Sequence, residues 1–537
     1  MKRGNLLVIL GNLCCVLVMV AQEKVGDAEK LGNVHFAVSC LPATQPQFDR
    51  AVAMLHSFWY PQGLNAFADI PKTDPDCAMA YWGMAISRRA NPMVGAPGAG
   101  PDALKDALEA VGKARLAGAK TQRERDYIAA IETYYKDWQK RDYRTRVLAY
   151  EKAMEDVYLR YPDDPEAAVF YALAIDEAVN VLPADPNFTR QLKAGSILEK
   201  VLAANPEHPG ALHYLIHSYD FPALADRGLA AARKYGDVAP AAPHALHMPS
   251  HVYSMLGMWP DSIKANQAAL SVANGYAHAL DFMVYAYLQM AQDNEAKRGV
   301  DRNMELLKSQ GASGAAAANP TGAVLAGYTA LAAIPARYAI ERGAWTEAAA
   351  LQPQVGTPVA DSITYFARAM GSVRSGDLDA ARKNIEQLKQ IEERLQESKD
   401  DYWAQQAEIQ RSAATAWVAN AEGKKDAAKR LMRSAADLED RSEKHVAMEN
   451  RLWPMRELLG DLLLEVAEPG PALKEYEISL QSARNRYRGL YGAAKAAQRT
   501  GNSEKARTYY ARLLTLCSHA DTERPELAEA KKYLAPK

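Results

Sequence analysis

Between about residues 190 and 305, small, hydrophobic and turn-forming positions recur at a spacing of 34 residues. One position in each repeat holds a small residue, a second holds Leu, a third holds Tyr and a fourth marks a turn. The four sets are Ala194, Gly228, Ser262 and Ala296; Leu212, Leu246 and Leu280; Tyr219, Tyr253 and Tyr287; and Pro206, Pro240 and Asn274. Because four independent positions share one period, the chain is predicted to repeat a unit of two helices joined by a turn.

A 34-residue period with small residues where two helices meet, and with a proline near the end of the second helix, resembles the tetratricopeptide repeat. The segment 256–259 (LGMW), followed by Ser262 and Ala269, carries this pattern most clearly. Similar turns follow at Gly343, Gly376, Gly423 and Gly501. The resemblance extends over most of the chain and implies an all-α fold, a superhelical array (α-solenoid) of antiparallel helical hairpins.

Several strings also resemble a group of exported bacterial tetratricopeptide proteins of poorly defined activity. They are LHSFWY at 55–60, DPDCAMAYWG at 74–83, HYLIHSYD at 213–220, HALHMPSHVY at 244–253, HALDFMVYAYLQ at 278–289 and RELLGDLLLE at 456–465. This second resemblance implies no particular reaction.

Composition suggests where the array divides. Residues 309–322, SQGASGAAAANPTG, have the small and polar composition of a linker. We therefore expect an N-terminal array over residues 22–308 with a histidine-rich groove, a linker over residues 309–322 and a C-terminal array over residues 323–537.

The N-terminus has the pattern of a secretory signal peptide. Lys2 and Arg3 precede an apolar run over residues 6–20 that is interrupted by Gly11 and Asn12. Residues 1–21 are therefore predicted to direct export to the periplasm or the outside, either as a cleaved signal or as an uncleaved anchor. No later segment is expected to span a membrane.

Export would place the cysteines that follow the signal in a compartment that permits disulfides. These cysteines are Cys40, Cys77 and Cys517. Cys40 and Cys77 form the one pairing that we consider, and the alternative is that both are buried thiols.

Charge narrows the classes of partner. The formal net charge is −1, with 24% charged residues. Such a chain has no long-range field, which argues against nucleic acid and anionic membranes as partners. A protein or peptide ligand fits this scaffold better.

Seven of the 11 histidines lie between His208 and His278. Three pairs of histidines are separated by one repeat, namely His213 and His247, His217 and His251, and His244 and His278. One repeat further, the first two columns continue as Asp281 and Tyr285. Residues at i, i+3 and i+7 share one helical face, so His244, His247 and His251 are expected to lie side by side on the concave groove. We assign His244, His278 and Tyr285 to this ligand groove.

The same stripe is a candidate metal site. Histidines four apart on adjacent helices can converge, so His213, His217, His247 and His251 could supply three or four nitrogens. Asp281 could add an oxygen ligand or orient a histidine. Imidazole-rich sites suit Zn, Cu, Fe or Ni, and the spacing does not select among these metals.

Proline at position 249 complicates this picture, because it lies between His247 and His251 and is expected to kink the helix, turning His251 toward the column or away from it. His35 and His56 belong to the N-terminal unit. We interpret them as surface or packing residues, and the alternative is that the folded array brings one of them toward the stripe.

Two functions follow from these observations. The first is an exported binding protein that recognises a peptide or protein partner in its groove. The second is a metal-binding protein or metal-dependent enzyme, a hydrolase or an oxidase, in which Asp281 or Tyr285 is positioned for proton transfer. The sequence contains no HExxH, GxSxG or GxxxxGK[ST] motif, so it leaves open whether the protein is an enzyme.

Overall fold

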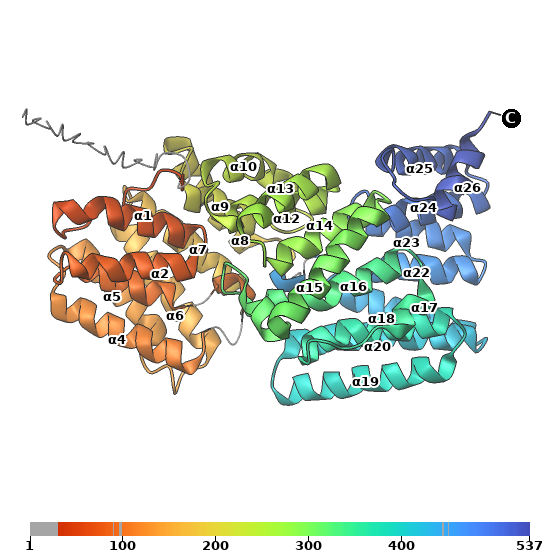
Figure 1. Ribbon diagram of the computed structural model, residues 1–537, viewed down its shortest axis with the longest axis horizontal. Coiled ribbons are helices and arrows are strands. Elements are labelled where there is room, and N and C mark those ends of the chain that lie inside the picture. The colour runs from red at the N-terminus through yellow and green to blue at the C-terminus, as the bar shows by residue number, and fades with distance from the viewer. Residues whose placement is uncertain (1–29, 90, 96–98, 443–444, 449, 537) are drawn as a thin grey trace, which may run out of the picture.

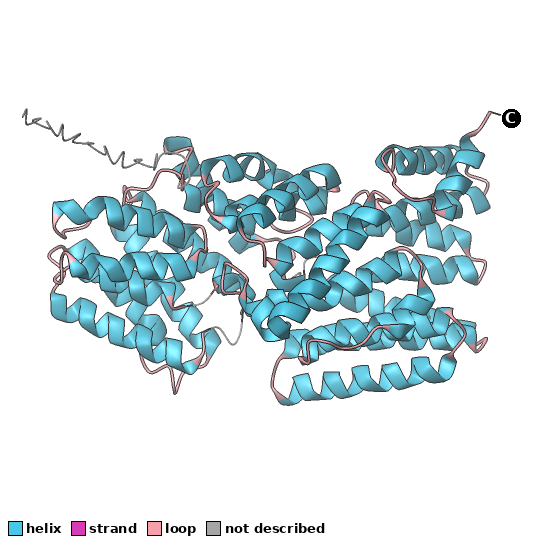
Figure 2. Ribbon diagram, viewed as in Figure 1, coloured by secondary structure: helices cyan, strands magenta, loops and turns pink. Residues whose placement is uncertain are grey.

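The computed structural model describes residues 30–89, 91–95, 99–442, 445–448 and 450–536. Within these ranges every regular element is a helix and there is no strand, as Figure 2 shows. Successive helices pack as hairpins along the molecule (Figure 1). The all-α fold and the α-solenoid architecture predicted from the sequence are therefore confirmed.

The first part of the chain forms a block of hairpins, drawn in red to orange in Figure 1. Its elements are η1 (Pro42–Thr44), α1 (Gln45–His56), α2 (Tyr60–Asp69), η2 (Ile70–Lys72), α3 (Ala78–Ser87), η3 (Pro92–Val94), α4 (Pro101–Ala117), α5 (Gln122–Tyr135), α6 (Tyr143–Arg160), α7 (Pro165–Val179) and α8 (Thr189–Ala204). Side chains cap several of these helices. Thr121 and Glu124, for example, form a capping box that satisfies backbone N–H groups at the start of α5.

The middle of the chain contains the repeats that the 34-residue period predicts. Its helices are α9 (Pro209–Ser218), α10 (Ala225–Val238), α11 (Pro243–His247), α12 (Pro249–Leu256), α13 (Trp259–Val272), α14 (Ala277–Gln289) and α15 (Asp293–Ala317). The small residues Gly228, Ser262 and Ala296 are buried on the second helix of successive hairpins. Small side chains there allow the paired helices to approach closely, as the sequence pattern predicts.

Proline 249 divides one repeat helix into α11 and α12. Met248, at the junction, keeps right-handed helical angles of φ −53° and ψ −35°. The backbone N–H of His251 donates to the carbonyl of Met248 at 3.1 Å, so the helix restarts at once. His251 therefore stays in line with His244 and His247.

The last part of the chain forms hairpins that turn back toward the middle repeats (Figure 1). Its elements are α16 (Val324–Glu341), α17 (Trp345–Ala350), α18 (Pro358–Arg374), α19 (Leu378–Glu397), α20 (Asp401–Ala421), α21 (Lys425–Arg441), η4 (Val446–Met448), α22 (Met455–Glu465), α23 (Pro469–Ser482), α24 (Tyr487–Arg499), α25 (Ser503–Leu516) and α26 (Pro525–Leu534).

Hydrogen bonds tie this last part to the middle repeats. The indole N–H of Trp259 donates to the carbonyl of Asn485 at 2.9 Å, and the backbone N–H of Tyr487 donates to Gln289 Oε1 at 2.9 Å. The C-terminal helices thus cover one side of the middle repeats.

The segment 309–322 differs from the expected linker. Helical backbone runs through it to Ala317 in two segments, which meet at Gly311, where φ is 67° and ψ is 171°. Ala315 and Ala316 are buried against the neighbouring helices. Glycine permits the positive φ at the kink, and the alanines pack closely, so a linker-like composition here gives a bent helix. The division into arrays over residues 22–308 and 323–537 stays a prediction.

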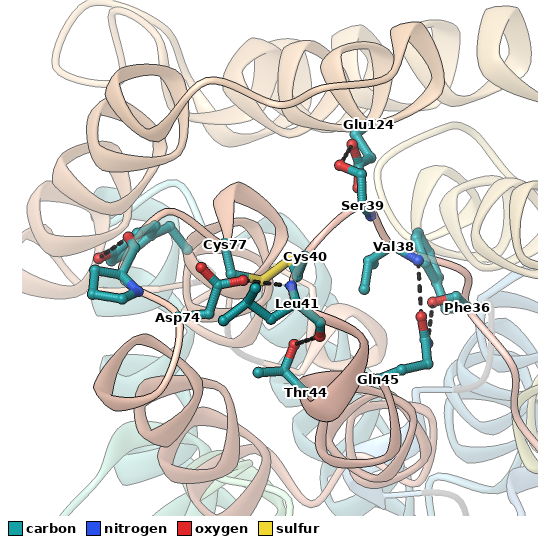
Figure 3. Close-up of a disulfide and its surroundings, with 12 residues drawn as sticks. Phe36, Val38, Ser39, Cys40, Leu41, Thr44, Gln45, Asp74, Cys77 and Glu124 are labelled. Atoms are coloured by element: carbon teal, nitrogen blue, oxygen red, sulfur yellow. Dashed lines mark hydrogen bonds between the residues drawn. A yellow bond between two sulfur atoms is a disulfide. The ribbon is translucent and has the colours of Figure 1, made fainter.

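Cys40 and Cys77 form a disulfide (Figure 3). Their Cα atoms lie 4.9 Å apart, and the bond joins the segment before η1 to the start of α3. Next to it, the backbone N–H of Leu41 donates to Asp74 at 2.7 Å. Of the two alternatives that the sequence left open, a disulfide or two buried thiols, the structure has the disulfide.

The predicted signal peptide, residues 1–21, lies outside the described residues. Among the helices that the structure describes, none combines the length and the apolar character needed to cross a membrane.

Candidate metal centre

Six histidines of the middle repeats converge in two groups of three. The first triad is His213 and His217 on α9 with His244 on α11. The second triad is His247 on α11 and His251 on α12 with His278 on α14. Each triad thus joins two histidines of one repeat to the leading histidine of the next repeat, and the second triad lies one 34-residue step after the first.

The side chains within each triad offer nitrogens that lie within 4.8 Å of one another. Around an ion bound at about 2.0–2.1 Å, three such nitrogens would lie about 3.4–3.6 Å apart. Small movements of the imidazole rings would therefore close either triad around one ion.

Hydrogen bonds to the opposite ring nitrogens hold four of these histidines in place. His213 Nδ1 donates to the carbonyl of His56 at 2.6 Å. His247 Nδ1 donates to Asn266 Oδ1 at 2.6 Å, and His251 Nδ1 donates to Asp220 Oδ2 at 3.0 Å. His244 Nδ1 lies 3.0 Å from the hydroxyl of Tyr276. An Nδ1–H bond of this kind leaves the Nε2 lone pair free, and metal-binding histidines are generally oriented in this way.

The Nε2 atoms of His247 and His251 face each other. In neutral His247 and His251 both Nδ1 atoms carry the proton, so both Nε2 atoms are acceptors, yet they lie 3.0 Å apart. Two lone pairs at this distance repel each other unless a cation is shared between them. The Nε2 atom of His244 is buried without a hydrogen-bond partner among the described residues. These atoms fit a metal ion better than they fit a hydrogen-bonded core.

A phenylalanine packs on each triad. Phe58 contacts the first triad, with ring centroids 4.4 Å from His213 and 5.6 Å from both His217 and His244. Phe282 contacts the second triad, with centroids 4.9–5.1 Å from its three histidines. Phe58 also has a φ of 50°, a conformation that a non-glycine residue adopts only where its surroundings enforce it.

Burial affects the charge of the histidines. Loss of solvent around the rings holds the pKa of His213, His244 and His247 well below its usual value, and the neighbouring imidazoles lower it further. Neutral imidazole is the form that binds metal ions, so the site keeps these rings ready for coordination.

A second polar cluster lies behind the first triad. Glu166 on α7 accepts from His56 Nε2 at 2.8 Å and from His208 Nε2 at 3.1 Å. Burial opposes ionisation of Glu166, but these two imidazoles hold its pKa well below the usual value. Because the carbonyl of His56 accepts from His213, this cluster fixes the first triad. The fold thus brings His56 to the stripe, which is the alternative that the sequence analysis set beside a packing role.

Asp281 and Tyr285, which continue the histidine columns, have other partners. Asp281 accepts from Arg337 Nε at 2.8 Å and from Arg337 Nη2 at 3.2 Å, and it belongs to neither triad. Tyr285 contacts Arg486 Nη1 at 2.5 Å through its hydroxyl. Both arginines come from the C-terminal part of the chain, so α14 uses these positions for packing. The structure therefore does not support Asp281 as an oxygen ligand.

The histidine face is not an open groove. The six histidines are at most 6% exposed, because Phe58, Phe282 and the neighbouring helices of the repeats pack against their rings. The assignment of His244, His278 and Tyr285 to a ligand groove stays a prediction.

A cavity of about 560 Å³ lies between the middle repeats and the C-terminal helices. Its wall includes His251, Tyr285, Phe221, Trp259, Arg451 and Arg456. Because His251 is part of this wall, the cavity reaches the second triad.

No protein-family model matches the chain, and no curated protein sequence matches it. The chain is similar to solved structures of tetratricopeptide-repeat proteins. One is the crystal structure of the APC/C hetero-tetramer Cut9–Hcn1, at 12% identity and a TM-score of 0.33, covering 91% of this chain and 90% of that one. Another is the human IFIT1 dimer with m7Gppp-AAAA, at 12% identity and a TM-score of 0.39, covering 82% and 90%. A third is a tetratricopeptide repeat protein from Parabacteroides merdae, at 11% identity and a TM-score of 0.26, covering 65% and 99%. Likenesses this remote concern helical-repeat architecture alone.

Proposed function

We propose that this protein is an exported metal-dependent enzyme, an oxidase or a hydrolase, whose centre consists of the two histidine triads. One observation carries the proposal. Six buried imidazoles converge, four of them are held through Nδ1, and the Nε2 atoms of His247 and His251 are placed 3.0 Å apart with no proton to share in their neutral forms.

The cavity supports an enzyme over a protein that only stores metal. It gives a small molecule or a chain terminus access to the second triad at His251. Its wall combines aromatic rings with the charged groups of Arg451, Arg456 and Glu439. Pockets that bind small substrates commonly have this mixture of apolar surface and a few polar groups. A metal ion at the end of such a cavity would polarise a bound substrate or activate a bound water.

Export is part of the proposal. The Cys40–Cys77 disulfide supports it, because disulfides persist mainly in oxidising compartments such as the periplasm and the outside of the cell. The positively charged start and apolar run of residues 1–21 are consistent with the same location.

A second candidate function is the metal-free capture of a peptide or protein partner. The same cavity favours it, because Phe221 and Trp259 could hold an apolar side chain while Arg451 and Arg456 pair with carboxylates. In this alternative the triads would serve only to support the wall of the cavity.

Elemental analysis distinguishes the two candidates. The wild-type protein is purified without chelators or a histidine tag, beside a variant with His213, His217, His247 and His251 changed to Gln. A variant with His35 and His519 changed to Ala is the matched control, since both are exposed histidines outside the triads.

We expect at least one equivalent of a transition metal in the wild type and in the control, and none in the four-histidine variant with its helicity unchanged. If the wild type stays free of metal even after incubation with Zn²⁺ and Cu²⁺, the enzyme proposal fails and partner capture is the function to test.

A further inference from the structure

The two triads are related by one repeat of the scaffold. His217 and His251 occupy equivalent positions in successive repeats, and their ring centroids lie 6.4 Å apart. His244 and His247, which belong to different triads, have ring centroids 6.1 Å apart, close to the 6.2 Å between His217 and His244 of the same triad. Ions in equivalent positions of the two triads would therefore be near neighbours, separated by a displacement similar to that of the rings.

The donor groups limit which metal can occupy such a pair. Among the described residues no carboxylate belongs to either triad. Asp220 accepts a hydrogen bond from His251 Nδ1, and Asp281 is paired with Arg337. The six donors are neutral imidazoles, and among divalent first-row ions copper binds a site of such nitrogen donors most tightly.

The two triads differ in how openly they face the cavity. His251 of the second triad forms part of the cavity wall, whereas no histidine of the first triad does so. The first triad is enclosed by Phe58, by α1 and by the carbonyl of His56. A small ligand that enters the cavity therefore meets the second position first.

We propose that the two triads hold a pair of copper ions with unequal access. The ion in the second triad meets ligands from the cavity, and the ion in the first triad is closed to them and exchanges electrons with its neighbour. In that exchange one Cu(I) becomes Cu(II) as the other Cu(II) becomes Cu(I), with no bond broken and no proton moved. This inference rests on the metal binding proposed above.

The full-length protein loaded with Cu²⁺ and freed of excess metal provides the test. We expect two copper ions per chain and a half-field signal in electron paramagnetic resonance, which arises only from cupric ions that are close neighbours. Added azide should change the spectrum of one of the two ions, because one position is open to the cavity.

Two variants show which copper ion belongs to which triad. With His213 and His217 changed to Gln, we expect one copper per chain, no half-field signal and a spectrum that responds to azide. With His247 and His278 changed to Gln, we expect one copper whose spectrum azide does not change. Circular dichroism establishes that the variants fold, and if either does not, the wild-type stoichiometry, half-field signal and azide response decide by themselves.

The outcomes separate the two proposals. Absence of any bound metal would reject the proposed function together with this inference. A single copper per chain, the full-intensity spectrum of two isolated cupric ions, or azide acting equally on both ions would each reject the unequal pair and leave metal binding intact.

Discussion

His251 Nδ1 donates to Asp220 Oδ2 at 3.0 Å, and both side chains are at most 3% exposed. Asp220 follows α9 of one repeat, whereas His251 lies on α12 of the next, so the bond connects two repeats at the metal centre. The carboxylate fixes the proton on Nδ1 and makes Nε2 a stronger donor to a metal ion.

Changing Asp220 to Asn should therefore weaken metal binding while leaving the six histidines in place. The amide oxygen can still accept from Nδ1 but carries no charge, and we expect a loss of affinity of about 10-fold to 100-fold. Competition with a chromophoric chelator measures the affinity. Asp226→Asn is the control, because Asp226 pairs with Arg484 on the surface. Equal affinities of the Asp220 and Asp226 variants would contradict this role.

Gly210→Ala should disturb the first triad from behind. A Cβ at Gly210 would lie 2.5 Å from His56 Nδ1, and the carbonyl of His56 accepts from His213. We expect the free energy of unfolding to fall by about 1–3 kcal/mol, as in other overpacked cores. Gly112→Ala is the matched control, because nothing lies within 4 Å of its Cβ and alanine favours a helix. Denaturant titrations of both variants make the comparison, and similar unfolding midpoints would show that His56 can move freely.

Loss of the Cys40–Cys77 disulfide should destabilise the N-terminal block. The bond closes a loop with a sequence separation of 37 residues, for which chain entropy predicts about 4 kcal/mol of stabilisation. Thermal unfolding with and without reductant, for the wild type and for a Cys40→Ala/Cys77→Ala variant, measures this contribution. We expect reductant to lower the melting temperature of the wild type alone. A wild type insensitive to reductant under unfolding conditions would mean that the bond does not stabilise the block.

His445 should make stability depend on pH. Burial lowers its pKa to about 4, while its Nε2 donates to the carbonyl of Val94 at 3.1 Å and its Nδ1 accepts from the N–H of Ala447 at 3.1 Å. The unfolded chain, with a pKa near 6.5, binds a proton more readily than the folded chain. The stabilisation is therefore complete above about pH 6.5 and is lost as the pH falls toward 4.

Between pH 7.5 and pH 5, the wild type should lose about 2 kcal/mol more stability than His445→Gln does. Urea titrations at both pH values measure the difference. Parallel losses in the two proteins would show that His445 titrates normally in the folded state.

The repeat period predicts most of the fold around the centre, because the repeats bury the same small and tyrosine positions and bury or partly bury the same leucine position. It also predicts the pairs His213 with His217 and His247 with His251, since residues four apart share a helical face. It does not identify the third member of each triad. His244 and His278 reach their triads across the gap between successive repeats, and that distance depends on how the helices pack.

Two further features lie beyond what spacing can indicate. Asp281 continues a histidine column but pairs with Arg337, which is 56 positions away in the sequence. The histidine face is buried because Phe58, from the N-terminal block, and Phe282, from the next repeat, pack on the triads, and the spacing of the histidines gives no sign of these contacts. In both cases contacts between distant segments override a regular local pattern.

The arrangement of each triad across two repeats limits how many such sites an array of this kind can contain. Each triad takes two histidines from one repeat and the third from the next repeat, so a single repeat cannot form a complete triad. Lengthening the row would require each new unit to provide both its own pair and a leading histidine for the unit before it. Here α14 begins with His278 but continues with Asp281 and Tyr285, so it completes its predecessor and ends the series.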